Sequence, residues 1–415
     1  MKKNIMILLV VVLLVLSAGS ALAWLPKGWV CHTGAYAYSI RDNGWYYFNP
    51  ADEQQIVDMT SGVWTKLASA TGWFYYEWAY AYSIDKGSWC WFNTANKQWC
   101  CKMGNGQWSK MGSFVKMMRV PGGTYNMGDS FSEGDNNERP VHSVSVNTFY
   151  MDRFEVTNDK MVEILNWAYG QGKISISSVG SVRNTDGDSR ELVDLDVPYC
   201  GITWNGSQFD MKAIRGSAYP CVEVTWYGAA AFCNYRSQQE GLTACYNLSD
   251  WSCNFNANGY RLPTEAEWER AARGGLSGQR FPFGNFINHD YANYYANGAS
   301  YTYDTSPYTT NTYHTSWNWG DKPYTSIVDT FPEWQNAYGL YDMAGNVWEW
   351  CNDWYSSNYY ASSSVNNPSG PASGTKKVLR GGCWGHTAFT CRVTARDFQT
   401  PNMSDSGRGF RCVRR

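Results

Sequence analysis

A gapless internal repeat constrains the first part of this chain more than any other feature of its sequence. The segments 28–29, 35–40, 45, 48–49 and 64 recur 44 positions later, at 72–73, 79–84, 89, 92–93 and 108. A fixed period of this length is typical of duplicated structural units. In each copy, short aromatic runs alternate with turns that contain Asn and Gly, a pattern typical of short strands joined by hairpins. The sequence therefore predicts two small β units, over 24–67 and 68–111.

The aromatic side chains of these repeats allow two interpretations. The units resemble the aromatic wall-binding repeats of bacterial surface proteins, in runs such as 45–49. That resemblance implies that the repeats dock the protein to a cell-surface or wall polymer. A unit of this size also needs large rings for its own core, which is the other interpretation.

The N-terminus has the pattern of a secretory signal peptide over 1–23. Two lysines precede an apolar run over 5–16, and Ala21-Leu22-Ala23 is a small-residue cleavage site. We expect a mature chain from Trp24, exported to the periplasm, the cell surface or the exterior of a bacterium. The apolar run is too short for a comfortable membrane span, so we do not expect an integral membrane protein; an uncleaved anchor is the alternative.

Charge and cysteine content restrict the partners and the compartment. The 34 Lys and Arg nearly balance the 36 Asp and Glu, which argues against a nucleic-acid partner. In an exported chain, 13 cysteines predict several disulfides and at least one cysteine without a partner in the chain. Aromatic residues make up 17% of the chain, so it can bury ample apolar surface and is not disordered.

Helix caps become recognisable after Met118. We predict helices at 158–167 behind Thr157, at 226–237 behind Thr225, and after Thr264, which forms a capping box with Glu267. Two glycines at 274–275 end the third helix. Residues 172–218 are interpreted as an excursion, and 296–325 as a polar aromatic loop of a kind that recognises ligands, although most such loops are only connections.

Seven motifs follow one another in order along the rest of the chain. They are PGGTYNMG (121–128), RFEVTN (153–158), VTWYGA (224–229), RLPTEAEWE (261–269), GLYDMAGNVWEW (339–350), LRGG (379–382) and GFRC (409–412). With them, residues 118–415 resemble the formylglycine-generating enzyme (sulfatase-modifying factor) family. The resemblance implies an α+β protein with the C-type-lectin-like formylglycine-generating-enzyme fold and much irregular structure.

The enzymes of that family oxidise a substrate cysteine to formylglycine with O₂, using a C-x4-C pair that holds Cu(I). Here Cys383 and Cys391 follow the LRGG motif, but seven residues lie between them. This departure favours a non-catalytic scaffold that binds a protein, peptide or glycan. The alternative is a formylglycine-generating oxidase or related maturation enzyme, in which Cys383, Cys391 and His386 form a shifted copper or redox site. The His spacing of the family's iron-dependent branch is absent from the sequence.

The resemblance also implies calcium, bound by hard oxygen ligands. One site is similar to Asp342, Gly345, Val347 and Glu349, for which an ordinary ion pair is the alternative. A second site would include Asn293 and Tyr294, with Asp321 as a guess for its later carboxylate.

A ligand groove and several disulfides complete these expectations. The groove would be lined by Trp348, Trp384 and Arg396. Cys233 and Cys412 match a disulfide of the family. Three further pairings are hypotheses: Cys351 with Cys391, Cys245 with Cys253 across a hairpin, and Cys200 with Cys221 at the excursion.

Overall fold

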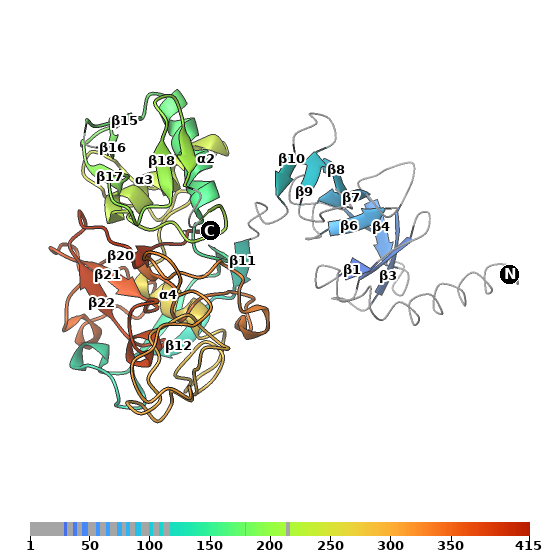
Figure 1. Cartoon of the computed structure of the whole chain (residues 1–415). Helices are drawn as coiled ribbons and strands as arrows, with labels where there is room; N and C mark the ends of the chain where they lie inside the picture. The colour runs from blue at the N-terminus through green and yellow to red at the C-terminus, as the bar shows by residue number, and fades with distance from the viewer. Residues whose placement is uncertain are drawn as a thin grey trace, which may run out of the picture. The chain divides into compact units, whose positions relative to one another are not determined.

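The computed structural model describes residues 117–178, 180–212 and 216–415, together with the backbone of ten strands between residues 29 and 110 (Figure 1). The chain divides into two compact units, Met1–Phe114 and Val115–Arg415. The expected signal peptide lies outside the described residues. Within the described residues, no helix combines the length and the apolar character that a membrane span requires.

The strands of the first unit form two five-stranded sheets in which each strand pairs antiparallel with the next along the chain. The first sheet contains β1 (Trp29–Val30), β2 (Tyr36–Ser39), β3 (Gly44–Phe48), β4 (Gln55–Asp58) and β5 (Trp64–Lys66). The second contains β6 (Trp73–Tyr76), β7 (Tyr80–Ser83), β8 (Ser88–Phe92), β9 (Trp99–Lys102) and β10 (Trp108–Lys110). Each strand of the second sheet begins 44 residues after its counterpart in the first.

All three helices that the caps predict are present in the second unit. They are α2 (Asn158–Gly170), α3 (Trp226–Gln239) and α4 (Glu265–Ala272). Thr225 caps α3 by accepting a hydrogen bond from the Gly228 N–H, and Thr264 and Glu267 form the expected capping box on α4. Thr157 differs, because its hydroxyl donates to Asp159 instead of accepting from the helix backbone.

The strands of the second unit are short and belong to several small sheets. In spatial order, these are β11 (Met117–Val120), β14 (Phe149–Asp152) and β24 (Val413–Arg414); β12 (Gly123–Met127) and β13 (His142–Val146); β15 (Ile174–Ile176), β16 (Ser181–Asn184) and β17 (Glu191–Asp194); β18 (Ile202–Trp204) and β19 (Phe209–Met211); and β22 (Asp397–Gln399), β21 (Lys377–Arg380), β20 (Trp348–Trp354) and β23 (Arg408–Gly409). Among the strands that the structure describes, β20 and β23 are the only parallel pair.

Long irregular segments separate these elements, and short 3-10 turns interrupt them. The turns are Asn136–Glu138, Pro332–Trp334, Tyr359–Ala361 and Ala388–Cys391. The excursion 172–218 carries β15 to β19, whereas 296–325 has neither helix nor strand, as its loop-like composition predicts. The expected α+β class, with few helices and much irregular structure, is confirmed.

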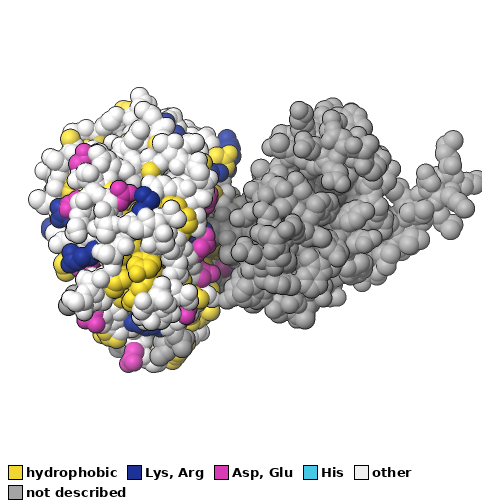
Figure 2. All heavy atoms as spheres, turned by 90° about the horizontal axis from the view of Figure 1, so that it is seen from above, with side chains coloured by type: hydrophobic (Ala, Val, Ile, Leu, Met, Phe, Trp, Pro, Cys, Tyr) yellow, Lys and Arg dark blue, Asp and Glu magenta, His cyan; other side chains and the backbone are white. Residues whose placement is uncertain are grey.

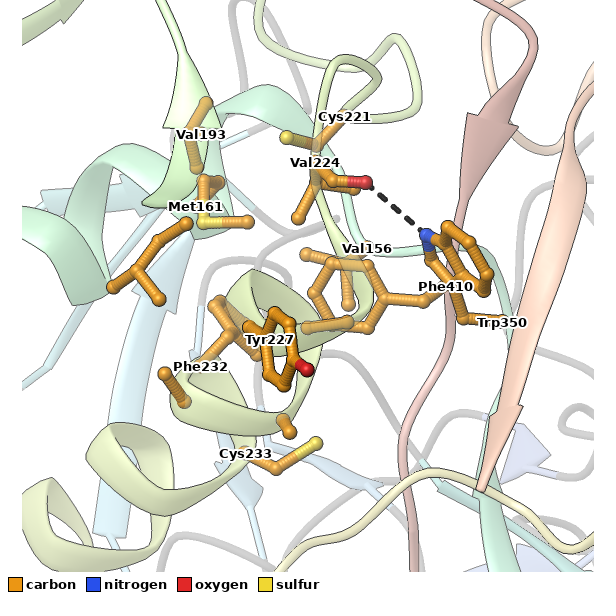
Figure 3. Packing of buried hydrophobic residues seen from close by; sticks show 14 of the residues in the cluster. Val156, Met161, Val193, Cys221, Val224, Tyr227, Phe232, Cys233, Trp350 and Phe410 are labelled. Carbon is orange, nitrogen blue, oxygen red and sulfur yellow. Dashed lines mark hydrogen bonds between the residues drawn. The ribbon is translucent and has the colours of Figure 1, made fainter. Parts of the chain in front are cut away.

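The largest core cluster packs around α3, which is buried on nearly every side (Figure 3). The ring of Phe232 on α3 meets the ring of Phe410 edge to face, with centroids 5.1 Å apart. The Trp350 indole N–H on β20 donates to the Val224 carbonyl oxygen at 3.1 Å. These contacts bring the C-terminal GFRC motif, β20 and the helix into one hydrophobic core.

Buried ion pairs connect α4 to the strand that leads into the candidate site. Arg273 and Arg380 both pair with Glu269, and Arg396 makes a bidentate pair with Glu265 at 2.6 and 2.9 Å. All five side chains are at most 5% exposed. Because a buried charge is tolerated only with a close partner, these pairs fix the end of β21 relative to α4.

Candidate functional site

The candidate site lies directly after β21, where the chain makes a tight turn. Gly381 and Gly382 both have positive φ, 97° and 77°. A Cβ atom on Gly382 would lie 2.9 Å from the Cys391 sulfur, so only glycine lets the backbone pass so close to that thiol. The LRGG motif therefore has a steric role here, and it places Cys391 against the backbone of the turn.

Cys383 and Cys391 are buried thiols. Their residues are 5% and 0% exposed. Burial raises the pKa of the Cys383 thiol to about 12, and burial also raises the pKa of Cys391, with a further contribution from Cys383. Copper(I) binds the thiolate form, and these environments favour the protonated form. Without a bound cation, both thiols are therefore held in the protonated form.

His386 is exposed, and the structure fixes its hydrogen-bonding state. The buried Trp348 indole N–H donates to its Nδ1 atom at 2.9 Å. Burial of its inner side lowers the pKa of His386, so the ring is neutral near pH 7. With Nδ1 accepting, the proton lies on Nε2, which acts as a donor and not as a metal ligand. Within the described residues, no three His, Cys, Asp or Glu side chains are grouped to hold a metal ion.

The first expected calcium set is only partly available for a cation. Both oxygens of the buried Glu349 accept from Arg411 at 2.7 Å, and one also accepts from the Trp268 indole at 2.9 Å. Glu349 thus forms an ordinary ion pair, which was the alternative to calcium binding. Its partner, Arg411, lies outside the motif 339–350. Asp342 makes no ion pair with a described residue, and burial raises its pKa to about 7, although the charge of Arg411 opposes this rise.

The carboxylate that sequence reasoning missed at this place is Glu155. It is 2% exposed, and its Oε2 atom is buried without a hydrogen-bond partner in the described structure. Burial raises the pKa of Glu155, and the charge of Asp342 raises it further. Two buried carboxyl groups that form no ion pair with the described residues suit a hard divalent cation. The position of Glu155 in the RFEVTN motif was the only sequence signal for it.

The second expected calcium segment touches the first. The Asn346 N–H donates to the Asn293 carbonyl oxygen at 2.7 Å, and a Cβ on Gly345 would lie 2.3 Å from that oxygen. The side-chain Oδ1 atom of Asn293 is buried without a partner among the described residues, which suits a cation ligand. Tyr294 is buried and donates its hydroxyl to Asp304, and Asp321 is exposed.

The three residues of the expected ligand groove are largely buried, and the groove itself stays a prediction. Trp348, Trp384 and Arg396 are 3%, 6% and 7% exposed, so none of them presents its side chain openly to solvent. Arg396 faces the interior because Glu265 binds its guanidinium. Lys322, in the polar aromatic loop, is exposed, and its ammonium lies 5.7 Å from the Trp384 ring centroid.

The nine described cysteines are all free thiols in the structure. The Cys233 and Cys412 sulfurs lie 3.6 Å apart, so this expected pair is in place but not bonded. Cys245 and Cys253 lie on neighbouring segments, because the Asn254 N–H donates to the Cys245 carbonyl oxygen at 2.7 Å, and Cys200 and Cys221 are buried in the same core cluster. Cys351 and Cys391 belong to different core clusters, and Cys391 is close to Cys383 instead. The pairings therefore stay predictions, and the structure gives no contact that favours Cys351 with Cys391.

One acidic side chain near the site predicts a pH dependence of stability. Burial, followed by the charges of Asp405 and Asp194, raises the pKa of Glu223 from 4.5 to about 7. The folded chain then holds a proton that the unfolded chain releases, so stability falls as the pH rises from about 4.5 to about 7. We expect Glu223→Gln to remove this loss and to stabilise the protein at pH 8 by roughly 1–3 kcal/mol.

Urea unfolding at pH 5 and pH 8 measures this difference. Glu163→Gln on α2, which removes an exposed carboxylate, is the matched control. An unchanged pH dependence in Glu223→Gln would show that Glu223 is not the responsible group.

Comparisons with known proteins give the same family as the motifs. Residues 106–415 match the family model described as "Sulfatase-modifying factor enzyme 1-like domain". The chain is 31% identical to the formylglycine-generating enzyme of Bos taurus, over 72% of this chain and 74% of that protein. It is also 31% identical to the bovine "Inactive C-alpha-formylglycine-generating enzyme 2", over 73% of this chain and 89% of that protein.

Similarity also extends to longer proteins and to solved structures. A serine/threonine-protein kinase, pkn1 of Chlamydia caviae, is 32% identical over 72% of this chain, which spans only 38% of that kinase. Among solved structures, Treponema denticola variable protein 1 is 26% identical with a TM-score of 0.49, over 72% of this chain and 94% of that chain.

Proposed function

The chain belongs to the sulfatase-modifying factor enzyme 1-like domain family, and from this membership we propose that it is an exported, non-catalytic scaffold that binds a ligand. The observation that carries the proposal is the state of Cys383 and Cys391. Both thiols are buried and held in the protonated form, where a copper-dependent oxidase needs thiolates. A relative of the same family whose printed name calls it inactive supports the proposal of a non-catalytic protein.

Calcium is the cofactor that the proposed scaffold would hold. Glu155 and Asp342 would supply its carboxylate oxygens, and Asn293 would supply an amide oxygen. Bound there, calcium would compensate two buried carboxyl groups and would stiffen the contact between the 293 and 346 segments. It would have a structural role and would take part in no reaction.

A formylglycine-generating oxidase or related maturation enzyme is the second candidate. One observation favours it: Cys383 and Cys391 are close enough for the charge of Cys383 to raise the pKa of Cys391. His386 lies between them in the sequence, but its Nδ1 atom is committed to Trp348. In that case the protein would act on a cysteine of an exported protein.

Metal analysis after anaerobic Cu(I) loading and dialysis separates the two candidates. We expect calcium to be retained and copper to be lost, because the thiols are protonated and the carboxyl groups lack a cation. The Cys383→Ser/Cys391→Ser variant should give the same metal content as the unmodified protein. About one copper per chain that this variant loses would overturn the scaffold proposal.

Thermal unfolding gives a separate test of calcium binding. Removing it with a chelator should lower the unfolding temperature, and adding it back should restore the original value. In Glu155→Gln this response should largely disappear, while the fold is retained because the substitution removes a buried charge. A full calcium response in that variant would exclude Glu155 as a ligand.

A further inference from the structure

A small pocket of about 130 Å³ lies on the second unit, and we call it the Phe255 pocket. Its described lining comes from the turn between β13 and β14, the segment before α4, the start of α4, the loop before β21 and Arg415, and includes no residue of the turn after β21. Pockets that enclose drug-sized ligands measure roughly 300–1,000 Å³. The Phe255 pocket therefore admits one small ring or group, and not an extended ligand.

The buried charges that line this pocket neutralise each other. Arg261 makes a bidentate ion pair with Glu267 at 2.6 and 2.7 Å, and that carboxylate also accepts the Thr264 N–H at 2.9 Å. Arg261 and Glu267 are only 3% and 8% exposed. The half-buried Phe255 ring supplies apolar surface beside them, with its centroid 5.1 Å from the Arg261 guanidinium. A ligand therefore needs no charge of its own to compensate this ion pair.

Uncharged polar side chains with unused hydrogen-bonding capacity line the exposed edge of the pocket. They belong to Asn147, Asn367 and Ser369. The Asn147 side-chain amide, the Nδ2 atom of Asn367 and the Ser369 hydroxyl make no hydrogen bond to any residue that the structure describes. An amide group offers two donors and an acceptor, and a hydroxyl offers both functions. These groups suit a ligand that presents several hydroxyl groups close together.

Hydrogen bonds hold this edge of the pocket in place. The Asn147 backbone N–H donates to the Asn367 Oδ1 atom at 2.8 Å, and the Asn367 N–H donates to the Ser145 carbonyl oxygen at 2.7 Å. Thr148 accepts the Gly122 N–H at 3.0 Å. Asn367 has a φ of 45°, in the left-handed region that asparagine tolerates better than most residues. A site fixed in this way loses little conformational entropy when it binds a ligand.

The charge near the pocket does not select an ion. Arg415 is exposed, and its Nη1 atom donates to the Asn256 Oδ1 atom at 3.3 Å, so this guanidinium is already engaged with an uncharged group. Figure 2 shows one face of the second unit, on which Lys and Arg side chains are interspersed with Asp and Glu and form no continuous field of one sign. Guanidinium groups also donate to hydroxyl oxygens, so Arg415 is compatible with a neutral ligand.

We propose that the Phe255 pocket binds one uncharged sugar ring of a glycan. A sugar ring has an apolar face of C–H groups, which would lie against Phe255, and an edge of hydroxyl groups, which would bond to the exposed amides and to Ser369. An apolar surface combined with a few placed polar groups is the usual composition of a small-ligand site. This inference rests on the proposed ligand-binding function, and it names a site and a ligand class for it.

An array of bacterial and plant oligosaccharides, probed with the full chain in the presence of calcium, tests the assignment. The glycan with the highest signal is then titrated by calorimetry, with the methyl glycoside of its terminal sugar as a competitor. We expect Asn147→Ala and Phe255→Ala each to bind this glycan at least about tenfold more weakly. Asn402→Ala, which removes an exposed amide outside the pocket, should bind it normally.

Asn147→Ala keeps the test valid if Phe255→Ala does not fold, because Asn147 is exposed and its backbone bond to Asn367 remains. Equal glycan binding by Asn147→Ala and Asn402→Ala would place the glycan elsewhere and would overturn the assignment. No binding to any glycan, binding only to glycans that carry a carboxylate or sulfate, or no competition by the methyl glycoside would overturn the ligand class. Retained copper would reject the scaffold while leaving the glycan result intact, so the two failures can be told apart.

Discussion

Replacing Glu269 with alanine is expected to lower the free energy of unfolding by about 3–5 kcal/mol, because two buried guanidinium groups would lose their counter-ion. Glu269 is fully buried and pairs with both Arg273 and Arg380. It also accepts the Gly128 N–H at 2.9 Å. Arg380 is fully buried as well, so no water can replace the lost carboxylate.

Urea unfolding at neutral pH measures this loss. The matched control is Glu133→Ala, because Glu133 makes a bidentate pair with Arg280 at 2.7 Å on the surface. An exposed pair of this kind contributes at most about 1 kcal/mol. Equal losses in the two variants would show that burial of the Glu269 pairs adds nothing to stability.

Replacing Arg411 with methionine is the second change for which we expect a large effect. Arg411 is fully buried and pairs with Glu349 at 2.7 Å, and its charge opposes the rise in the pKa of Glu155 and of Asp342. Its removal leaves an uncompensated Glu349 charge beside two other carboxyl groups. We expect a loss of about 3–5 kcal/mol in the free energy of unfolding.

The double variant Glu349→Gln/Arg411→Met separates the charge from the packing. It removes both members of the pair, so it should be less destabilised than Arg411→Met alone when both are compared by urea unfolding. If the double variant is the less stable of the two, the loss in Arg411→Met comes from packing and from the bonds of Arg411 to the carbonyl oxygens of Asp152, Arg153 and Tyr341.

The sequence located those elements of the second unit whose signals are local. Helix α4 is bounded by a capping box and by two glycines with positive φ, 58° and 84°. Helix α3 begins where Thr225 can accept from its first turn. Seven ordered motifs identified the family, and their agreement with the family model over 106–415 shows that this information resides in short runs of residues.

The candidate site was predicted less completely, because its groups are assembled from distant parts of the chain. Arg396 was expected at a groove, but Glu265, 131 positions away, draws it into the interior. Glu349 was expected to bind calcium, but Arg411 occupies its oxygens. Glu155 was not singled out, although it meets Asp342 in space. In each case the partner is far away in sequence, where no local pattern can indicate it.

The sequence by itself determined the family, the three helices, the loop character of 296–325 and the lack of a C-x4-C pair, since each depends on residue types at short spacing. Only the tertiary structure decided which charges are neutralised, which thiols are buried and which aromatic rings reach the surface. Those properties depend on burial and on contacts between segments that are separated in sequence, by 62 positions for Glu349 and Arg411 and by 131 for Glu265 and Arg396.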